Sequence, residues 1–170
     1  MKYLVVVDMQ NDFISGSLGS KEAQAIVPYV EQVIRNFDET VLFTRDTHFD
    51  NYMDTQEGKN LPVPHCIHNT DGWQIHPQLD ALRITEAIDK DTFGSKDLVG
   101  VLADADDMES ITFLGLCTDI CVISNVMLVK AFFPEVPIFV DAKGCAGATP
   151  ASHANALEAM KAVQVKILHE

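Results

Sequence analysis

The sequence predicts an α/β fold, a three-layer doubly wound sheet of about six mainly parallel strands with helices on both faces. Two observations predict this class. Short runs such as YLVVVD, residues 3–8, are apolar and rich in β-branched residues, which suits strands buried on both faces of a parallel sheet. Helix-like stretches alternate with these runs along the whole chain, without a repeat or a linker. Residues 1–170 are therefore expected to form one domain.

The expected strands follow one another in chain order. The run at 3–8 is the first, and TVLFTR at 40–45 and ITEAID at 84–89 are the second and third. The series continues with ITFLGL, PIFVD and VKIL, at residues 111–116, 137–141 and 165–168. Their length and their apolar character are typical of buried strands.

Helices are expected between the strands, over residues 21–37, 97–103, 119–133 and 151–162. One connection breaks this alternation. Residues 49–75 form a long irregular segment with two prolines. A loop of this length inside a compact domain usually has a function.

The composition restricts the possible partners. The 170 residues carry a net charge of −13 at pH 7 without any basic cluster, which argues against nucleic acid and membrane as partners. The apolar run after Met1 is too short for a signal sequence, and no stretch is long enough to span a bilayer, so a cytoplasmic protein is expected. The four cysteines are scattered along the chain, and no disulfide framework is expected. Small molecules or other proteins are the expected partners.

Polar side chains stand where the predicted strands end. Asp8 ends the first strand, Asp46 follows the second, Lys90 follows the third, and the segment from Cys117 to Cys121 follows the fourth. Ligands of open parallel sheets bind beyond the carboxyl ends of the strands. An acid, a lysine, a thiol and an acid–histidine pair are therefore expected at one edge of the sheet.

Cys121 is the candidate nucleophile at this edge. Thr118 is a possible helix cap, which would place Cys121 in the first helical turn, where the helix dipole lowers the pKa of a thiol. The Lys90 ammonium would favour the thiolate further, and Asp8 could accept the thiol proton. The alternative for either cysteine is a small buried apolar residue, which is the commoner role of a cysteine after a strand.

A metal site is the second candidate feature. Asp46 and His48 form a D-x-H pair after the second strand, and His65 returns to the same region after the long loop. One carboxylate and two imidazoles suit Zn, Fe or Mn. Any one of these histidines, taken alone, is more often a surface or satisfied core residue.

Several motifs together resemble one family. VVVDMQNDF, DTH, PHC, Lys90 with the following DTFGS, GLCTDICV and ATPASHANALEAM occur in the order typical of the isochorismatase-like cysteine hydrolases, and most closely of their nicotinamidase branch. The resemblance implies a catalytic triad of Asp8, Lys90 and Cys121. Lys96 is expected to be exposed, because it falls in the following helix.

The resemblance also implies the finer parts of the site. It implies a cis peptide bond between Leu116 and Cys117, and an oxyanion hole formed by the backbone N–H groups of Cys117 and Cys121. It implies a divalent ion held by Asp46, His48 and His65, and no organic cofactor. Asp54 or Glu57 could supply a fourth ligand, and His68 and His76 are expected on the surface.

The resemblance implies that the ion holds the ring nitrogen of nicotinamide, directly or through a water molecule, and that aromatic side chains stack on both sides of the ring. Phe13 would form one wall here. The usual tryptophan before the metal-binding histidine is missing, and Leu61 or Pro62 stands in its place. Trp73 could reach the pocket from another direction.

The function expected from this resemblance is cysteine-dependent hydrolysis of a small primary amide with release of ammonia, with nicotinamide as the first candidate. A ureido or carbamoyl amide is the alternative within the same family. Isochorismate hydrolysis is disfavoured, because that chemistry needs no cysteine nucleophile. A catalytically idle binding domain is the alternative from another class, since a fold does not prove an activity. Homo-oligomers are common in this group.

Overall fold

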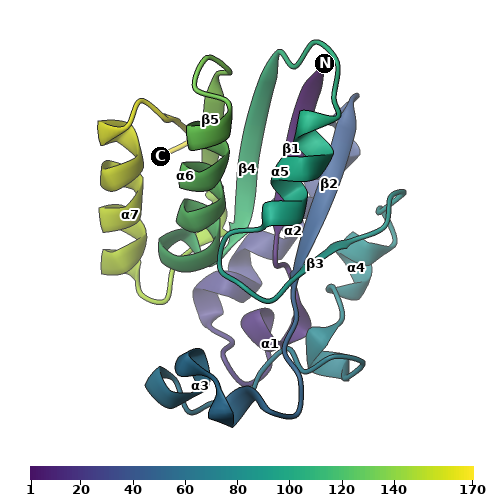
Figure 1. Ribbon diagram of the computed structural model, residues 1–170, viewed down its shortest axis with the longest axis vertical. Coiled ribbons are helices and arrows are strands. Elements are labelled where there is room, and N and C mark those ends of the chain that lie inside the picture. Colours follow the sequence, from purple (N-terminus) through teal and green to yellow (C-terminus); the bar gives the residue numbers. More distant parts are fainter.

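The computed structural model describes residues 1–170 and contains one six-stranded parallel sheet (Figure 1). The strands lie in the order β3-β2-β1-β4-β5-β6. Their bounds are β1 Lys2–Val7, β2 Thr40–Asp46, β3 Ile88–Lys90, β4 Ser110–Leu116, β5 Ile138–Ala146 and β6 Lys166–Leu168. The predicted α/β class is confirmed, and the strand order is that of a sheet wound outward in both directions from β1 and β4.

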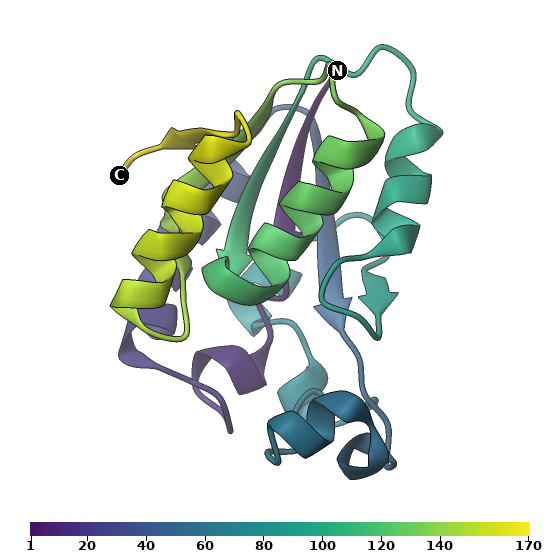
Figure 2. The ribbon, with the colours of Figure 1, turned by 60° about the vertical axis from the view of Figure 1, so that its left-hand side comes forward.

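The helices cover both faces of this sheet. Helices α5, α6 and α7 lie on one face and α2 lies on the other (Figures 1 and 2). Two short helices, α1 and α3, lie beyond the carboxyl ends of the strands (Figure 1). The helical bounds are α1 Asn11–Ile14, α2 Lys21–Arg35, α3 Gln56–Asn60, α4 Pro77–Asp80, α5 Lys96–Ala103, α6 Ile123–Phe132 and α7 Pro150–Ala162.

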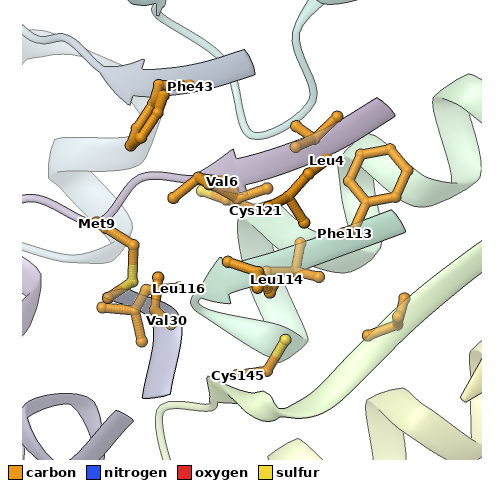
Figure 3. Close-up of a cluster of buried hydrophobic side chains, with 14 of the residues drawn as sticks. Leu4, Val6, Met9, Val30, Phe43, Phe113, Leu114, Leu116, Cys121 and Cys145 are labelled. Atoms are coloured by element: carbon orange, nitrogen blue, oxygen red, sulfur yellow. The ribbon is translucent and has the colours of Figure 1, made fainter. Parts of the chain in front are cut away.

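The central strand β1 is buried because every residue from Tyr3 to Val7 packs in the core. It pairs with β2 on one side and with β4 on the other. Apolar side chains of the three strands meet helices above and below them (Figure 3). The continuous apolar run was therefore a correct sign of a strand covered on both faces.

Two predicted strands have different lengths in the structure. The third strand is only Ile88–Lys90, since Ile84 is 91% exposed and the preceding residues form turns. The fifth strand extends to Ala146, five residues past its predicted end at Asp141, and pairs again with the end of β4. Apolar residues such as Ile84 suggested a strand although they are exposed, and the polar Lys143 and the glycine after it hid the continuation of β5.

The segment 49–75 is not irregular throughout. It contains α3 and two 3-10 turns, Tyr52–Asp54 and Asp71–Trp73. Thr55 caps α3, and its hydroxyl accepts a hydrogen bond from the N–H of Gly58. None of the helices in the chain is both long enough and apolar enough to cross a membrane.

Gly115 lets β4 run against the end of β1. Its φ of +121° lies in a region that side chains rarely adopt, and a Cβ at this position would overlap the carbonyl oxygen of Val7. Asp8 directly follows Val7, the last residue of β1. The close approach of β4 to Val7 therefore fixes the position of Asp8, the first candidate catalytic residue.

Gly115→Ala is expected to lower the free energy of unfolding by more than about 2 kcal/mol, because the methyl group strains the backbone and separates β1 from β4. Urea denaturation measures the change. Gly100→Ala in α5 is the matched control, since a Cβ there meets no atom within 4 Å. That variant is expected to gain up to about 1 kcal/mol from helix propensity. Equal stabilities of the two variants would contradict this role of Gly115.

Candidate active site

A cavity of about 1000 Å³ lies at the carboxyl ends of the strands. Its walls come from segments that are far apart in the sequence. They include Phe13, Asp46, His48, Leu61, His65 and Cys121. The structure thus brings the candidate nucleophile, the candidate metal ligands and both candidate substrate contacts to one cavity.

Lys90 is the centre of the polar contacts beside this cavity. It ends β3, next to Asp46 of β2 in the parallel register, and it is only 5% exposed. Its Nζ lies 2.7 Å from Oδ2 of Asp8, 3.4 Å from Oδ1 of Asp46 and 3.5 Å from Sγ of Cys121. Nζ also donates a 3.1 Å hydrogen bond to the carbonyl oxygen of Thr92.

The charges of this cluster depend on one another. Burial alone would disfavour the ammonium of Lys90, but the nearby Asp8, Cys121 and Asp46 raise its pKa above the ordinary value. Burial raises the pKa of Asp8, although Lys90 opposes that shift. The hydroxyl of Thr44 donates a 2.7 Å hydrogen bond to Oδ1 of Asp8 and fixes the carboxyl group. A carboxylate with a raised pKa is a stronger base, which suits a group that must accept a proton.

Cys121 lies in a π-helical turn, Thr118–Val122, that precedes α6. The expectation that Thr118 caps this turn is wrong. Cys117 occupies the cap position, and the Thr118 hydroxyl instead pairs with Nδ1 of His153 at 2.7 Å. The expected lowering of the thiol pKa is also wrong. Burial and the charge of Asp8 together raise the pKa of Cys121 well above its ordinary value, although Lys90 opposes them. The resting thiol is therefore protonated.

The peptide bond between Leu116 and Cys117 is cis, which confirms that expectation. The N–H of Cys117 donates no hydrogen bond to the chain, and Cys117 lines the cavity. Its thiol gains no activation there, since burial raises the pKa of Cys117 to about 12. An N–H group that is free beside a cavity can bind a developing negative charge. The oxyanion hole itself stays a prediction.

The three predicted metal ligands and one of the two candidates for a fourth converge in the cavity that Cys121 lines. Asp46, His48, Glu57 and His65 each offer an atom, and these atoms all lie within 4.8 Å of one another. Nε2 of His48 lies 2.9 Å from Oδ2 of Asp46, and Nε2 of His65 lies 3.6 Å from the same oxygen. Both imidazole nitrogens lie 3.5 Å from Oε1 of Glu57.

The chemistry of these groups fits a divalent transition metal. Nδ1 of His65 is paired with the carbonyl oxygen of Val63 at 2.8 Å, so Nδ1 carries the proton and Nε2 is free to bind an ion. Two imidazoles and two carboxylates suit Zn, Fe or Mn. Burial alone would raise the pKa of Asp46, but His48, whose Nε2 lies 2.9 Å from Oδ2, and the charge of Lys90 outweigh it and lower that pKa, so the carboxylate suits a cation.

Glu57, and not Asp54, joins this set. Asp54 is exposed in the turn before α3, and it is not part of the cluster. Glu57 lies in the first turn of α3 and lines the cavity. A Cβ on the adjacent Gly58 would overlap the carbonyl oxygen of Tyr52, so glycine allows α3 to pack where Glu57 reaches the cluster.

Phe13 and Leu61 both line the cavity, as expected of substrate contacts. The Phe13 ring is tilted against His65, with 5.4 Å between ring centroids. Tyr52 was not predicted. Its ring packs edge-on against His48 at 4.8 Å and His65 at 5.1 Å, and its hydroxyl donates to the carbonyl oxygen of Leu61. It therefore supports both imidazoles and the chain at Leu61.

Trp73 does not reach the cavity, which contradicts that hypothesis. Its ring is buried under the guanidinium of Arg45, 3.5 Å away, and its Nε1 donates to the hydroxyl of Thr47.

Lys96 is exposed at the start of α5, as predicted. His68 is exposed as well, whereas His76 is half-buried and burial lowers its pKa.

Two buried amides also hold the site together, and neither was predicted. The side chain of Gln10 bonds both the N–H and the carbonyl oxygen of Asp46 and so continues the contact with β2 past the end of β1. Asn125 of α6 bonds the carbonyl oxygen of Cys121. Gln10 was visible as a polar residue directly after a buried strand, and Asn125 as the one amide within an apolar helix.

Comparisons with known proteins agree with this geometry. A profile described as the isochorismatase domain matches residues 2–169. The nicotinamidase of Schizosaccharomyces pombe is 21% identical over 98% of this chain and 92% of its own length. The nicotinamidase of Escherichia coli is 26% identical over 94% and 90%. The pyrazinamidase of Pyrococcus horikoshii, solved in complex with zinc, has a TM-score of 0.81 and 27% identity, with 99% of each chain covered.

Glu57→Gln is expected to weaken zinc binding by about tenfold or more, because it removes one charged ligand without changing the shape of the side chain. Competition against a chromophoric chelator measures the affinity. Asp54→Asn is the matched control, since it changes an acidic residue three positions away that lies outside the cluster. Equal affinities for the two variants would exclude Glu57 as a ligand.

Proposed function

The chain belongs to the isochorismatase family, and from this membership we propose that it is a cysteine-dependent amidohydrolase that converts nicotinamide to nicotinate and ammonia. One observation carries the proposal. The buried ammonium of Lys90 contacts both Asp8 and Cys121, and the candidate metal ligands line the same cavity as Cys121. The first group of residues suits cleavage of an amide, and the second suits recognition of a ring nitrogen.

The first half of the proposed reaction forms a thioester. As Sγ of Cys121 attacks the amide carbonyl carbon, the Asp8 carboxylate accepts the thiol proton. The N–H groups of Cys117 and Cys121 donate to the carbonyl oxygen, which becomes negatively charged in the tetrahedral intermediate. Asp8 then returns the proton to the amide nitrogen, the carbon–nitrogen bond breaks, and ammonia leaves.

The second half restores the thiol. Asp8 accepts a proton from water, the hydroxyl attacks the thioester carbon, and the same N–H groups bind the oxyanion again. The bond between carbon and Sγ breaks, Cys121 regains its proton, and the carboxylic acid leaves. Lys90 keeps its proton throughout. Its ammonium compensates the negative charge that moves between Asp8 and Cys121.

The ring of the substrate would lie against Phe13, with the amide over Cys121. A divalent ion, when bound, would act as a Lewis acid that holds the ring nitrogen directly or through a water molecule. Asp46, His48, Glu57 and His65 would hold that ion, and zinc is our first choice because a structural relative is described in complex with it. The four free thiols fit a reducing, cytoplasmic location.

A ureido or carbamoyl amide is the second candidate substrate. Leu61 is aliphatic and 38% exposed at the place where a second aromatic wall is expected, so a substrate ring has no stacking partner at that position. A substrate without an aromatic ring would lose less from this replacement than nicotinamide. A catalytically idle domain is disfavoured, because all three reacting residues are present and in contact.

Cys121→Ala is expected to abolish hydrolysis of nicotinamide, whereas Cys117→Ala keeps most of it, because Cys117 acts through its backbone. Lys90→Met is expected to lower kcat by about a hundredfold to ten-thousandfold, since the charge of the nucleophile is no longer compensated. Release of ammonia measures all three. Lys96→Met is the control for the lysine and should match the unaltered protein. Equal losses in the two cysteine variants would contradict the backbone role.

Removal of the metal separates nicotinamide from other amides. Chelation is expected to lower kcat/KM for nicotinamide by about a hundredfold or more, because one orienting contact is lost. Benzamide has the same shape without the ring nitrogen, and it should be a poor substrate that responds little to chelation. The comparison uses ammonia release before chelation, after it and after zinc is restored. Equal rates for both amides with the metal present would favour a substrate without a pyridine ring.

A further inference from the structure

Asn125 lies one helical turn after Cys121 and has no part in the proposed chemistry. It is fully buried on α6, next to Val126 of the same helix and after the turn that contains Cys121. An amide in such a place costs free energy unless its polar atoms are bonded. The bonds that this side chain makes therefore indicate what it does.

All of its polar groups bind elements of the active site. Oδ1 accepts a 2.9 Å hydrogen bond from the backbone N–H of Ser95. Nδ2 donates to the carbonyl oxygen of Phe93 at 3.2 Å and to that of Cys121 at 2.8 Å. One side chain thus connects the segment after β3, residues 92–95, to the turn that carries the nucleophile.

Segment 92–95 in turn holds the Lys90 side chain. The carbonyl oxygen of Thr92 accepts the 3.1 Å hydrogen bond from Nζ of Lys90, and the Thr92 hydroxyl donates to the carbonyl oxygen of Gly94 at 2.7 Å. Phe93 lines the cavity. A Cβ on Gly94 would lie 3.1 Å from the carbonyl oxygen of Ser124, so the segment packs closely against α6.

We infer that Asn125 is a positioning residue: it holds segment 92–95 against the nucleophile turn and so fixes the separation between the Lys90 ammonium and the Cys121 thiol, 3.5 Å in the structure. The inference rests on the proposed roles of Lys90 and Cys121. Lys90 ends β3 and Cys121 lies in the turn after β4. No backbone hydrogen bond outside the regular elements links the two, and Asn125 supplies the connection.

Asn125→Leu keeps the branched shape of the side chain and removes all three hydrogen bonds. We expect kcat for nicotinamide to fall by about a hundredfold, as a small displacement of a reacting pair does, with a smaller change in KM. The cluster of metal ligands and Phe13 lie on other elements, which is why binding should change less than turnover.

Alkylation of Cys121 by iodoacetamide separates lost positioning from general loosening. The nearby ammonium lowers the pKa of the thiol, so displacing it should slow alkylation at fixed pH and move the pH profile upward. Loosening of the fold would instead expose the buried thiol and speed its alkylation. Mass spectrometry of the peptide that contains Cys121 distinguishes it from the other three cysteines.

Two further variants distinguish a displaced segment from a general loss of stability. Gly94→Ala leaves Asn125 intact but pushes the same segment away from α6, and it should change kcat and the alkylation profile in the same direction by a smaller factor. A control variant must lower stability without touching this segment. Ser20→Ala is the matched control: it removes the hydroxyl that caps α2 on the other face of the sheet, so it should lower the Tm and leave kcat unchanged.

The inference is overturned if Asn125→Leu or Gly94→Ala folds and keeps the kcat and the alkylation profile of the unaltered protein. It is also overturned if alkylation becomes faster in step with the loss of Tm. If the unaltered protein does not hydrolyse nicotinamide, the proposed function fails, and the alkylation profiles still test the role of Asn125.

Discussion

The buried ammonium of Lys90 is the interaction on which the site depends. A charge in the protein interior is stable only when opposite charges and hydrogen bonds replace the water it has lost. Here Asp8 and Asp46 supply the charge, and the carbonyl oxygen of Thr92 supplies a further acceptor. Loss of any one partner would leave a buried group uncompensated. The ends of β1, β2 and β3 and the nucleophile turn are therefore held at fixed positions around one atom.

The strand order explains why these groups can meet. β1 lies between β2 and β4, with β3 beside β2, so Asp8 leaves the sheet between the lysine side and the cysteine side. Asp46 then belongs to two centres at once, since Oδ1 faces Lys90 and Oδ2 faces His48. The two oxygens of one carboxylate thus keep the reacting groups and the metal ligands in a fixed relation.

The sequence predicted the sheet and the convergence of Asp8, Lys90 and Cys121, because buried parallel strands have a plain apolar pattern and a common polar end. It could not predict the pKa of Cys121. A position in a first helical turn suggested an acidic thiol, while the burial that raises the pKa arises only when the whole site has assembled. Trp73 was misplaced for a similar reason, since its partner Arg45 lies in β2. The bonds of Asn125 to residues 93–95 are likewise tertiary, and no local pattern encodes them.

Cys121 is protected by its own burial. Only the thiolate reacts readily with peroxides and other oxidants, and the path to sulfinic and sulfonic acids starts from that form. A thiol that is 4% exposed and has a raised pKa enters this chemistry less readily than an exposed thiol of ordinary pKa. In the proposed reaction the sulfur becomes nucleophilic while a carbonyl carbon lies beside it and Asp8 accepts its proton. The resting protein therefore holds the sulfur of the proposed nucleophile in its less reactive, protonated form, and in the proposed reaction binding of the substrate begins its activation.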